Sequence, residues 1–151
     1  MPNKCSHSIM FHHFHNDEHL PSQGAKSDLL IEKLTDLSAT GAKVLVFSQF
    51  TSFLDILRKR IDLELPGLSI VELTGSTRNR SQPVEQFENS NDSIVMLASM
   101  KAAGLGVTLK SADYVFLMDP WWNPAVEEQA IDRAHRIGRI KPTFIYRLVT
   151  K

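Results

Sequence analysis

The residues best suited to bind an anion lie near the end of the chain, in the segment QAIDRAHRIGR, residues 129–139. Three arginines and one histidine fall within these eleven residues, although the formal net charge of the whole chain is zero. With about 100° between successive residues of a helix, Gln129, Arg133 and Arg136 share one narrow stripe. Arginine suits phosphate because its planar guanidinium donates two parallel hydrogen bonds and stays charged. The pattern predicts a helix edge that presents two guanidiniums and a carboxamide to an anion.

The same helix has a second stripe, and its charges allow a simpler interpretation. Small or apolar side chains form the second stripe and are expected to pack on a sheet: Val126, Ala130, Ala134 and Ile137. Asp132 and Arg136 are four residues apart, so they can form a solvated ion pair that needs no ligand. Residues 133–151 hold six lysines and arginines and no acidic residue, which suits an anion but also an exposed cationic surface. The spacing alone leaves both interpretations open.

Loops upstream of this helix could also contact phosphate or a base. The segment KAAGLG, residues 101–106, combines a lysine with glycines that let backbone amides approach a phosphate closely. It is no G-x-x-x-x-G-K-[ST] phosphate loop, because Leu109 stands where that pattern requires glycine. Asp119 ends a strand as a magnesium-binding aspartate would, but no second carboxylate follows it. Trp121 and Trp122 can pack in the core, or one ring can stack on a base.

The elements that would position these residues alternate between strand and helix. Apolar runs predict buried strands at 43–48, 69–73, 93–99, 112–119 and 143–150, and helical spacing predicts helices at 27–41, 50–61, 79–89 and 124–138. The first helix is expected to begin at a Ser27–Asp28 cap. The second is expected to bury Phe53, Leu54, Leu57 and Ile61. This order predicts an α/β fold with a mainly parallel sheet covered on both faces, and ligand sites in the loops after the carboxyl ends of its strands.

Residues 1–24 differ from the rest of the chain. They hold five of the six histidines, and LPSQG closes the segment like a linker, so we expect a poorly ordered leader before one domain at residues 25–151. The side chains in it that suit zinc are those of Cys5, His7, His12, His13, His15 and His19. Their spacing fits no ordered zinc framework, so we predict no native metal site. A histidine-rich metal-binding protein is kept as a third hypothesis.

Length and composition limit the classes of protein to which this chain can belong. A chain of 151 residues can bury a proper core as one domain. Seventeen basic residues balance seventeen acidic ones, so any contact with nucleic acid must come from local patches. The single cysteine fits a reducing compartment, either bacterial cytoplasm or eukaryotic nucleus. No apolar run approaches the roughly eighteen residues that a membrane span needs. We therefore expect an intracellular protein without a membrane partner, monomeric in isolation.

Four segments carry a family resemblance in the same order along the chain: KVLVFSQF, ELTGSTRNR, LASMKAAGLGVTL and DPWWNPAVEEQAIDRAHRIGR. With them the sequence resembles the second RecA-like lobe of the Swi/Snf family of superfamily-two DNA-dependent ATPases. The similarity runs from about Ala25 to Lys151, and the last motif is highly specific. The resemblance implies a three-layer αβα lobe of an ATP-dependent double-stranded DNA translocase, which remodels chromatin or other protein–DNA complexes.

The resemblance also implies roles for individual residues. Arg133 and Arg136 would be arginine fingers that stabilise charge developing on ATP phosphates. The residues that would order that helix are Gln129 and Asp132, and those that would bring backbone close to the nucleotide are Gly104 and Gly106. The contacts to DNA phosphates would come from Ser48, Gln49, Thr77, Arg80, Ser99 and Lys101, with Trp122 touching the strand in the groove.

Some positions depart from the family pattern: Thr74, Ala103, Thr108 and Arg139 stand where Asp, Gly, Asn and Gln are usual. None of these removes a finger, although they bear on how the lobe is coupled to its ligands. The first lobe, which would hold ATP and Mg²⁺, and a C-terminal brace are missing from the sequence. We therefore predict that the chain alone does not hydrolyse ATP and needs a first lobe in cis or in trans. The alternative is a stand-alone or degenerate nucleic-acid-binding or regulatory module without ATPase activity.

Overall fold

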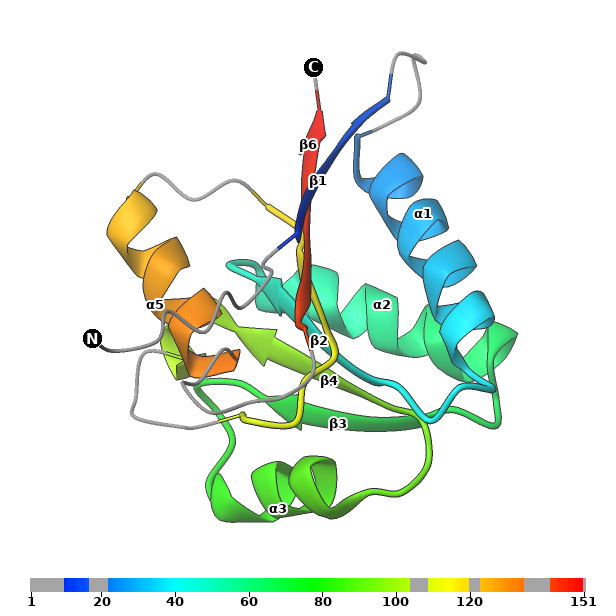
Figure 1. Ribbon diagram of the computed structural model, residues 1–151, viewed down its shortest axis with the longest axis vertical. Coiled ribbons are helices and arrows are strands. Elements are labelled where there is room, and N and C mark those ends of the chain that lie inside the picture. The colour runs from blue at the N-terminus through cyan, green and yellow to red at the C-terminus, as the bar shows by residue number, and fades with distance from the viewer. Residues whose placement is uncertain (1–9, 17–21, 104–108, 120–122, 135–141, 151) are drawn as a thin grey trace, which may run out of the picture.

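The computed structural model describes residues 10–16, 22–103, 109–119, 123–134 and 142–150, which form one sheet with helices on both faces (Figure 1). The strands in these ranges are β1 (Met10–Asn16), β2 (Lys43–Ser48), β3 (Ser69–Leu73), β4 (Ile94–Ser99), β5 (Tyr114–Leu117) and β6 (Phe144–Thr150). Neighbouring strands are parallel throughout, in the order β1-β6-β5-β2-β4-β3. The predicted α/β fold with a parallel sheet is confirmed.

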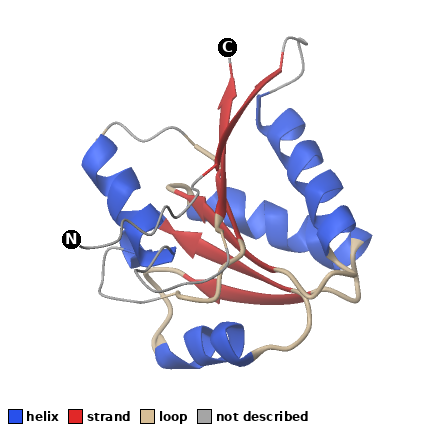
Figure 2. Ribbon diagram, viewed as in Figure 1, coloured by secondary structure: helices blue, strands red, loops and turns tan. Residues whose placement is uncertain are grey.

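The helices divide between the two faces of the sheet. Those in the described ranges are α1 (Ser22–Leu37), α2 (Thr51–Glu64), α3 (Ser81–Asn89), α4 (Met100–Ala103) and α5 (Pro124–Ala134). Side chains of α1 and α2 form one core cluster with the sheet, and side chains of α3, α4 and α5 form the other. Figures 1 and 2 show α1 and α2 across the strands from α3 and α5. The result is the three-layer αβα arrangement.

The central strands read as unbroken apolar runs because both of their faces are covered. Along β2, Val44 and Val46 belong to the α1–α2 side, whereas Leu45 and Phe47 belong to the other side. Every residue of β4 is buried. A parallel sheet needs this double cover, since its crossover helices pack on both faces. The sequence pattern and the layers therefore agree.

Helix α2 confirms the predicted helical spacing. Its buried residues are Phe53, Leu54, Leu57 and Ile61, the four expected to face inward. They pack in the same cluster as Val46 and Phe116 of the sheet. Burying one such side chain contributes about 1.5–3 kcal/mol relative to leaving it exposed. This face therefore fixes α2, and with it the loop between β2 and α2.

Two features near the N-terminus differ from the expectations. Helix α1 begins at Ser22, and Ser27 is an interior residue whose hydroxyl donates to the carbonyl of Gly24 (2.9 Å) and accepts from Arg60 (2.8 Å). The expected cap at Ser27–Asp28 was wrong because this serine is used in a tertiary contact. Residues 10–16 of the expected leader form edge strand β1, which pairs with β6 from Met10↔Phe144 to Asn16↔Thr150. Strand pairing uses backbone groups, so it needs no apolar pattern at an edge.

Candidate functional site

The carboxyl ends of three adjacent strands meet at one edge of the sheet. Ser48 and Ser99, the last residues of β2 and β4, are register partners, and Leu73 at the end of β3 lies opposite Ala98. The loops after these strands carry the predicted DNA-contact residues up to position 101. The structure therefore brings these residues to the sheet edge where an α/β fold places ligands.

Asp119, two residues beyond the end of β5, holds the loop that follows β2. The hydroxyl of Ser48 donates to Asp119 Oδ2 (2.5 Å), and the backbone N–H of Gln49 donates to the same oxygen (2.8 Å). Ser48 Oγ also accepts the backbone N–H of Phe50 (3.1 Å). Ser48 is only 1% exposed, whereas Gln49 is half-buried and Phe50 is 50% exposed. Ser48 therefore supports the loop from inside, and the side chains of Gln49 and Phe50 reach the surface.

Lys26 approaches the same end of β5 from α1. Its Nζ donates to the backbone carbonyl of Met118 (2.9 Å), which precedes Asp119. Burial lowers the pKa of Lys26, and the negative charge of Asp119 offsets part of that effect. Asp119 thus accepts two donors of the loop after β2 and interacts electrostatically with a half-buried cation. The sequence assigned no such role to this aspartate, and the available signal was an acidic residue directly after a buried strand.

The loop after β3 is a compact turn that presents Thr77 and Arg80. Thr77 Oγ1 accepts the backbone N–H of Thr74 (3.0 Å), and the backbone N–H of Thr77 donates to the carbonyl of Thr74 (3.1 Å). Thr77 and Arg80 are each half-buried, so part of both side chains is exposed. An open groove of about 370 Å³ lies beside the turn; its polar lining is Arg58, Glu72, Thr77, Arg78, Asn79, Gln82 and Gln86.

The residues after β4 differ in exposure. Ser99 is 4% exposed, and its Oγ accepts the backbone N–H of Ala102 (3.2 Å) at the start of α4. Lys101 is exposed. Ser99 therefore caps the short helix that carries Lys101, a helix that occupies the first residues of the predicted loop. Of the two predicted contacts, Lys101 offers its side chain to solvent.

Helix α5 carries part of the stripe predicted to hold Gln129, Arg133 and Arg136. Of these residues, Gln129 is exposed at the surface. Val126 packs against the core as expected, and Ile131, which the spacing did not assign to the packing side, is buried at 6% exposure. Helix α5 packs on α4, and Ile131 belongs to the core cluster that includes residues of the sheet, so burial on this helix extends beyond the predicted stripe. Asn123 Oδ1 accepts the backbone N–H of Ala125 (3.0 Å) at the start of the helix.

Several site predictions lie outside the described residues. These are the predictions for Gly104, Gly106, Trp122 and Arg136, together with Ile137 of the apolar stripe. For Asp132 and Arg133 the structure describes the backbone of α5 and not the side chains. Arg133 follows Gln129 by four residues in that helix, so its Cα lies about one turn further on the same side.

The described ranges also bear on metal sites and membrane spans. No group of three or more His, Cys, Asp or Glu side chains there is placed to hold a metal ion. Among the helices of those ranges, none is long and apolar enough to cross a membrane. The histidine side chains of residues 10–16 lie outside the described ones, so the metal-binding hypothesis stays a prediction.

Comparisons with known proteins agree with this geometry. Residues 25–138 match the family described as helicase conserved C-terminal domain. The DNA repair protein RAD5A of Arabidopsis thaliana is 43% identical over 131 residues, 85% of this chain and 12% of its own length. The human SWI/SNF-related matrix-associated actin-dependent regulator of chromatin subfamily A member 1 is 39% identical over 97% of this chain and 15% of its own length.

A solved structure gives the same result for the fold. The C-terminal part of the Fun30 ATPase domain is similar at a TM-score of 0.73 and 35% identity, over 91% of this chain and 44% of that chain. The matched family spans β2 to α5, which includes the whole sheet edge described above. This chain covers less than a sixth of either curated relative. It belongs to the helicase conserved C-terminal domain family, as a second RecA-like lobe of the Swi/Snf type.

Proposed function

We propose that this chain is the lobe of an ATP-dependent double-stranded DNA translocase that completes the ATPase site and contacts DNA phosphates. The observation that carries the proposal is one sheet edge where Gln49, Thr77, Arg80 and Lys101 are at least partly exposed after three adjacent strands. Cations and hydrogen-bond donors on one rigid edge can follow a phosphate backbone without reading bases. An intracellular location beside DNA, in bacterial cytoplasm or eukaryotic nucleus, belongs to the same proposal.

The buried members of the predicted contact set have a supporting part in this proposal. Ser48 and Ser99 use their hydroxyl groups within the protein, on Asp119 and on α4. They hold the loops that carry Gln49 and Lys101. Trp122 would touch the same strand in the groove.

The ATPase part of the proposal rests on α5. Arg133 and Arg136 would be the arginine fingers, ordered by Gln129 and Asp132, with Gly104 and Gly106 bringing backbone close to the nucleotide. ATP with Mg²⁺, held mainly by a first lobe, supplies the phosphoryl group, and guanidiniums stabilise the charge that develops on it. An exposed Gln129 one turn before Arg133 fits a helix that faces a ligand from one side. The chain itself has no phosphate-loop sequence, so it would hold ATP only together with the first lobe.

The test measures ATP hydrolysis with and without duplex DNA, for the chain alone and for the chain joined to a first lobe of the same family. We expect no turnover by the chain alone and DNA-stimulated turnover by the joined protein. Arg136→Ala should lower kcat of the joined protein by about a thousandfold or more, as loss of an arginine finger does elsewhere. DNA binding by the lobe should change little.

The control is Lys59→Ala. Lys59 is an exposed cation of α2, does not line the groove beside Thr77 and is not among the proposed contacts. Its loss should leave kcat within about twofold. Turnover by the chain alone would contradict the proposal of a shared site. A folded joined protein that binds DNA without hydrolysing ATP would favour the nucleic-acid-binding module instead.

A further inference from the structure

We infer that Asp119 is a positioning residue for DNA contact, because its carboxylate fixes the backbone at Gln49 and thereby sets the direction of the loop after β2. The inference rests on the proposed DNA contacts. Two donors of the loop, the hydroxyl of Ser48 and the N–H of Gln49, end on a single oxygen, Oδ2, at 2.5 and 2.8 Å. One acceptor thus controls the two residues at which β2 passes into the surface loop.

The loop has few other constraints of its own. Phe50, the N-cap of α2, makes no side-chain capping bond, and its carbonyl accepts the N–H groups of Phe53 and Leu54 (3.2 Å each). The N–H of Phe50 donates to Ser48 Oγ, which itself depends on Asp119. Without the carboxylate, the hydroxyl of a buried serine and one backbone N–H lose their acceptor, and the loop must turn to satisfy them elsewhere.

Hydrogen bonds fix the backbone of Met118, the residue just before Asp119. The backbone N–H of Met118 donates to the carbonyl of Phe47 (2.9 Å), which extends the pairing of β2 and β5. Lys26 Nζ donates to the carbonyl of Met118 (2.9 Å). Asp119 also precedes Asn123, at the start of α5, by four residues. The residue that fixes the loop after β2 therefore lies only a few residues in sequence before the helix that carries Gln129 and Arg133.

The charge of Asp119 argues for positioning and against direct contact. A carboxylate repels a phosphate, and Asp119 already accepts two hydrogen bonds inside the protein. The half-buried ammonium of Lys26 lies close enough to interact electrostatically with it. Its effect on DNA binding must therefore pass through the residues that it holds.

The chain offers a matched control at the opposite end of the same two strands. Asp113, just before β5, accepts the backbone N–H of Lys43, the first residue of β2, at 2.9 Å through Oδ2. Asp113 and Asp119 are both half-buried and both brace β2, but only Asp119 lies at the carboxyl end of the strands. Asp113→Ala therefore removes a similar contact away from the proposed DNA site.

The experiment measures Kd for a short fluorescent DNA duplex by anisotropy at low salt, with the full chain and its variants, and unfolding by urea in parallel. Asp119→Ala should raise Kd about tenfold, the size expected when a hydrogen bond to a charged phosphate is lost. Asp113→Ala should lower stability similarly and leave Kd unchanged. In a Gln49→Ala background, Asp119→Ala should add little, because it acts through that residue. Asp119→Asn keeps a neutral acceptor and should raise Kd about threefold. This variant provides the test if the alanine variant does not fold.

The outcomes separate the inference from the proposed function. Wild-type binding that neither Asp119 variant weakens would overturn the inference and leave the DNA contacts standing. The inference would also be overturned if Asp113→Ala weakened DNA binding equally, or if the effects of Asp119→Ala and Gln49→Ala on Kd were fully additive. Asp119 would then contribute only to general stability. A folded wild-type chain that does not bind the duplex would overturn the proposed DNA contacts and this inference together.

Discussion

The ammonium of Lys26 is half-buried between α1 and the end of β5, where it donates to the carbonyl of Met118. Burial lowers its pKa below the usual 10.5, despite the attraction of Asp119. In the interval between the lowered pKa and 10.5, the unfolded chain binds more protons than the folded chain. The contribution of Lys26 to the free energy of unfolding must therefore increase as pH rises across this interval and decrease as pH falls through it.

This sign gives a prediction for Lys26→Met. The difference in free energy of unfolding, wild type minus variant, should increase as pH rises toward the ordinary lysine pKa of 10.5. Urea unfolding of both proteins at matched pH measures it, and all other titrating groups cancel in the difference. Lys59→Met, which removes an exposed ammonium from α2, controls for the loss of a positive charge. A difference that stays flat or decreases with pH would show that burial does not lower this pKa.

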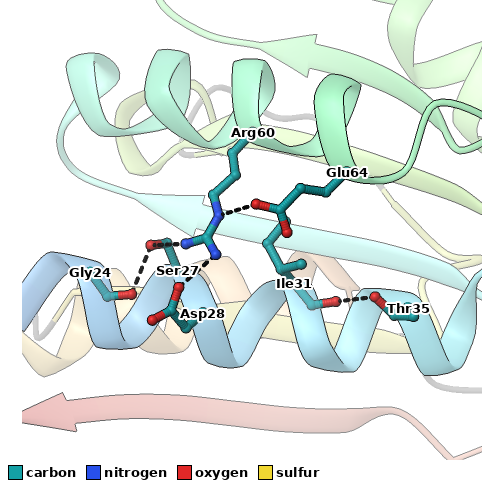
Figure 3. Close-up of polar contacts among 7 residues, drawn as sticks. All are labelled: Gly24, Ser27, Asp28, Ile31, Thr35, Arg60 and Glu64. Carbon is teal, nitrogen blue, oxygen red and sulfur yellow. Dashed lines mark hydrogen bonds and ion pairs between the residues drawn. The ribbon is translucent and has the colours of Figure 1, made fainter.

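Between elements, Arg60 joins α1 to α2 (Figure 3). Its guanidinium contacts Asp28 (2.6 Å) and Ser27 Oγ (2.8 Å) on α1 and Glu64 (2.7 Å) one turn further along α2. Hydrogen bonds to Glu64 and Asp28 raise the pKa of Arg60, so it stays charged at any working pH. Three partners in fixed directions use the planar fork of arginine, which lysine cannot reproduce.

We predict that Arg60→Ala lowers the free energy of unfolding by about 1 kcal/mol, the upper end for exposed ion pairs, because several partners share one cation. Arg60→Lys should recover less than half of that loss. Arg58→Ala is the control: its contacts with Asp62 (3.7 Å) and Glu72 (3.3 Å) are longer, and its loss should change little. Urea unfolding at low and high salt checks both claims, since salt should shrink the Arg60 effect. Equal effects of the two alanine variants would remove any special role for Arg60.

The elements also show what sequence patterns can and cannot predict. The buried face of α2 was predicted residue by residue because helical periodicity is a local property. The start of α1 was not, because Ser27 makes its decisive contact with Arg60, 33 residues away. Ile131 was missed because α5 packs on α4, and Ile131 belongs to the core cluster that includes residues of the sheet. Edge strand β1 was missed because its pairing uses backbone groups that no side-chain pattern reveals.

For the molecule as a whole, the order of strands and helices predicted which residues share a sheet edge better than it predicted their side-chain contacts. Alternating elements require parallel strands, and parallel strands bring their carboxyl ends to one edge. That edge now carries Gln49, Thr77, Arg80 and Lys101. The burial of Ser48 and Ser99, and the role of Asp119, depend on side-chain contacts between strands that are far apart in sequence. No spacing rule covers such contacts.

The neutral net charge gives a final prediction about DNA binding by the isolated lobe. Without a global field, binding must depend on local cations, and the predicted DNA contacts include two, Arg80 and Lys101. Each neutralised phosphate contributes about 0.9 to the slope of log Kd against log salt, so we expect a slope of about 2. Arg80→Ala and Lys101→Ala should each lower the slope by about 1. Gln49→Ala should weaken binding and leave the slope unchanged, because a carboxamide releases no counterions.

Anisotropy titrations at several salt concentrations measure these slopes, and two duplexes of equal length and different sequence test the absence of base readout. Contacts to phosphates carry no base information, so the two Kd values should agree within about twofold. Lys59→Ala removes an exposed cation of α2 that does not line the groove beside Thr77, and it should leave the slope as it is. A slope that neither Arg80→Ala nor Lys101→Ala changes would place the DNA elsewhere on the lobe. A strong preference for one duplex would mean that the edge reads bases, and the proposed translocase contacts would then be wrong.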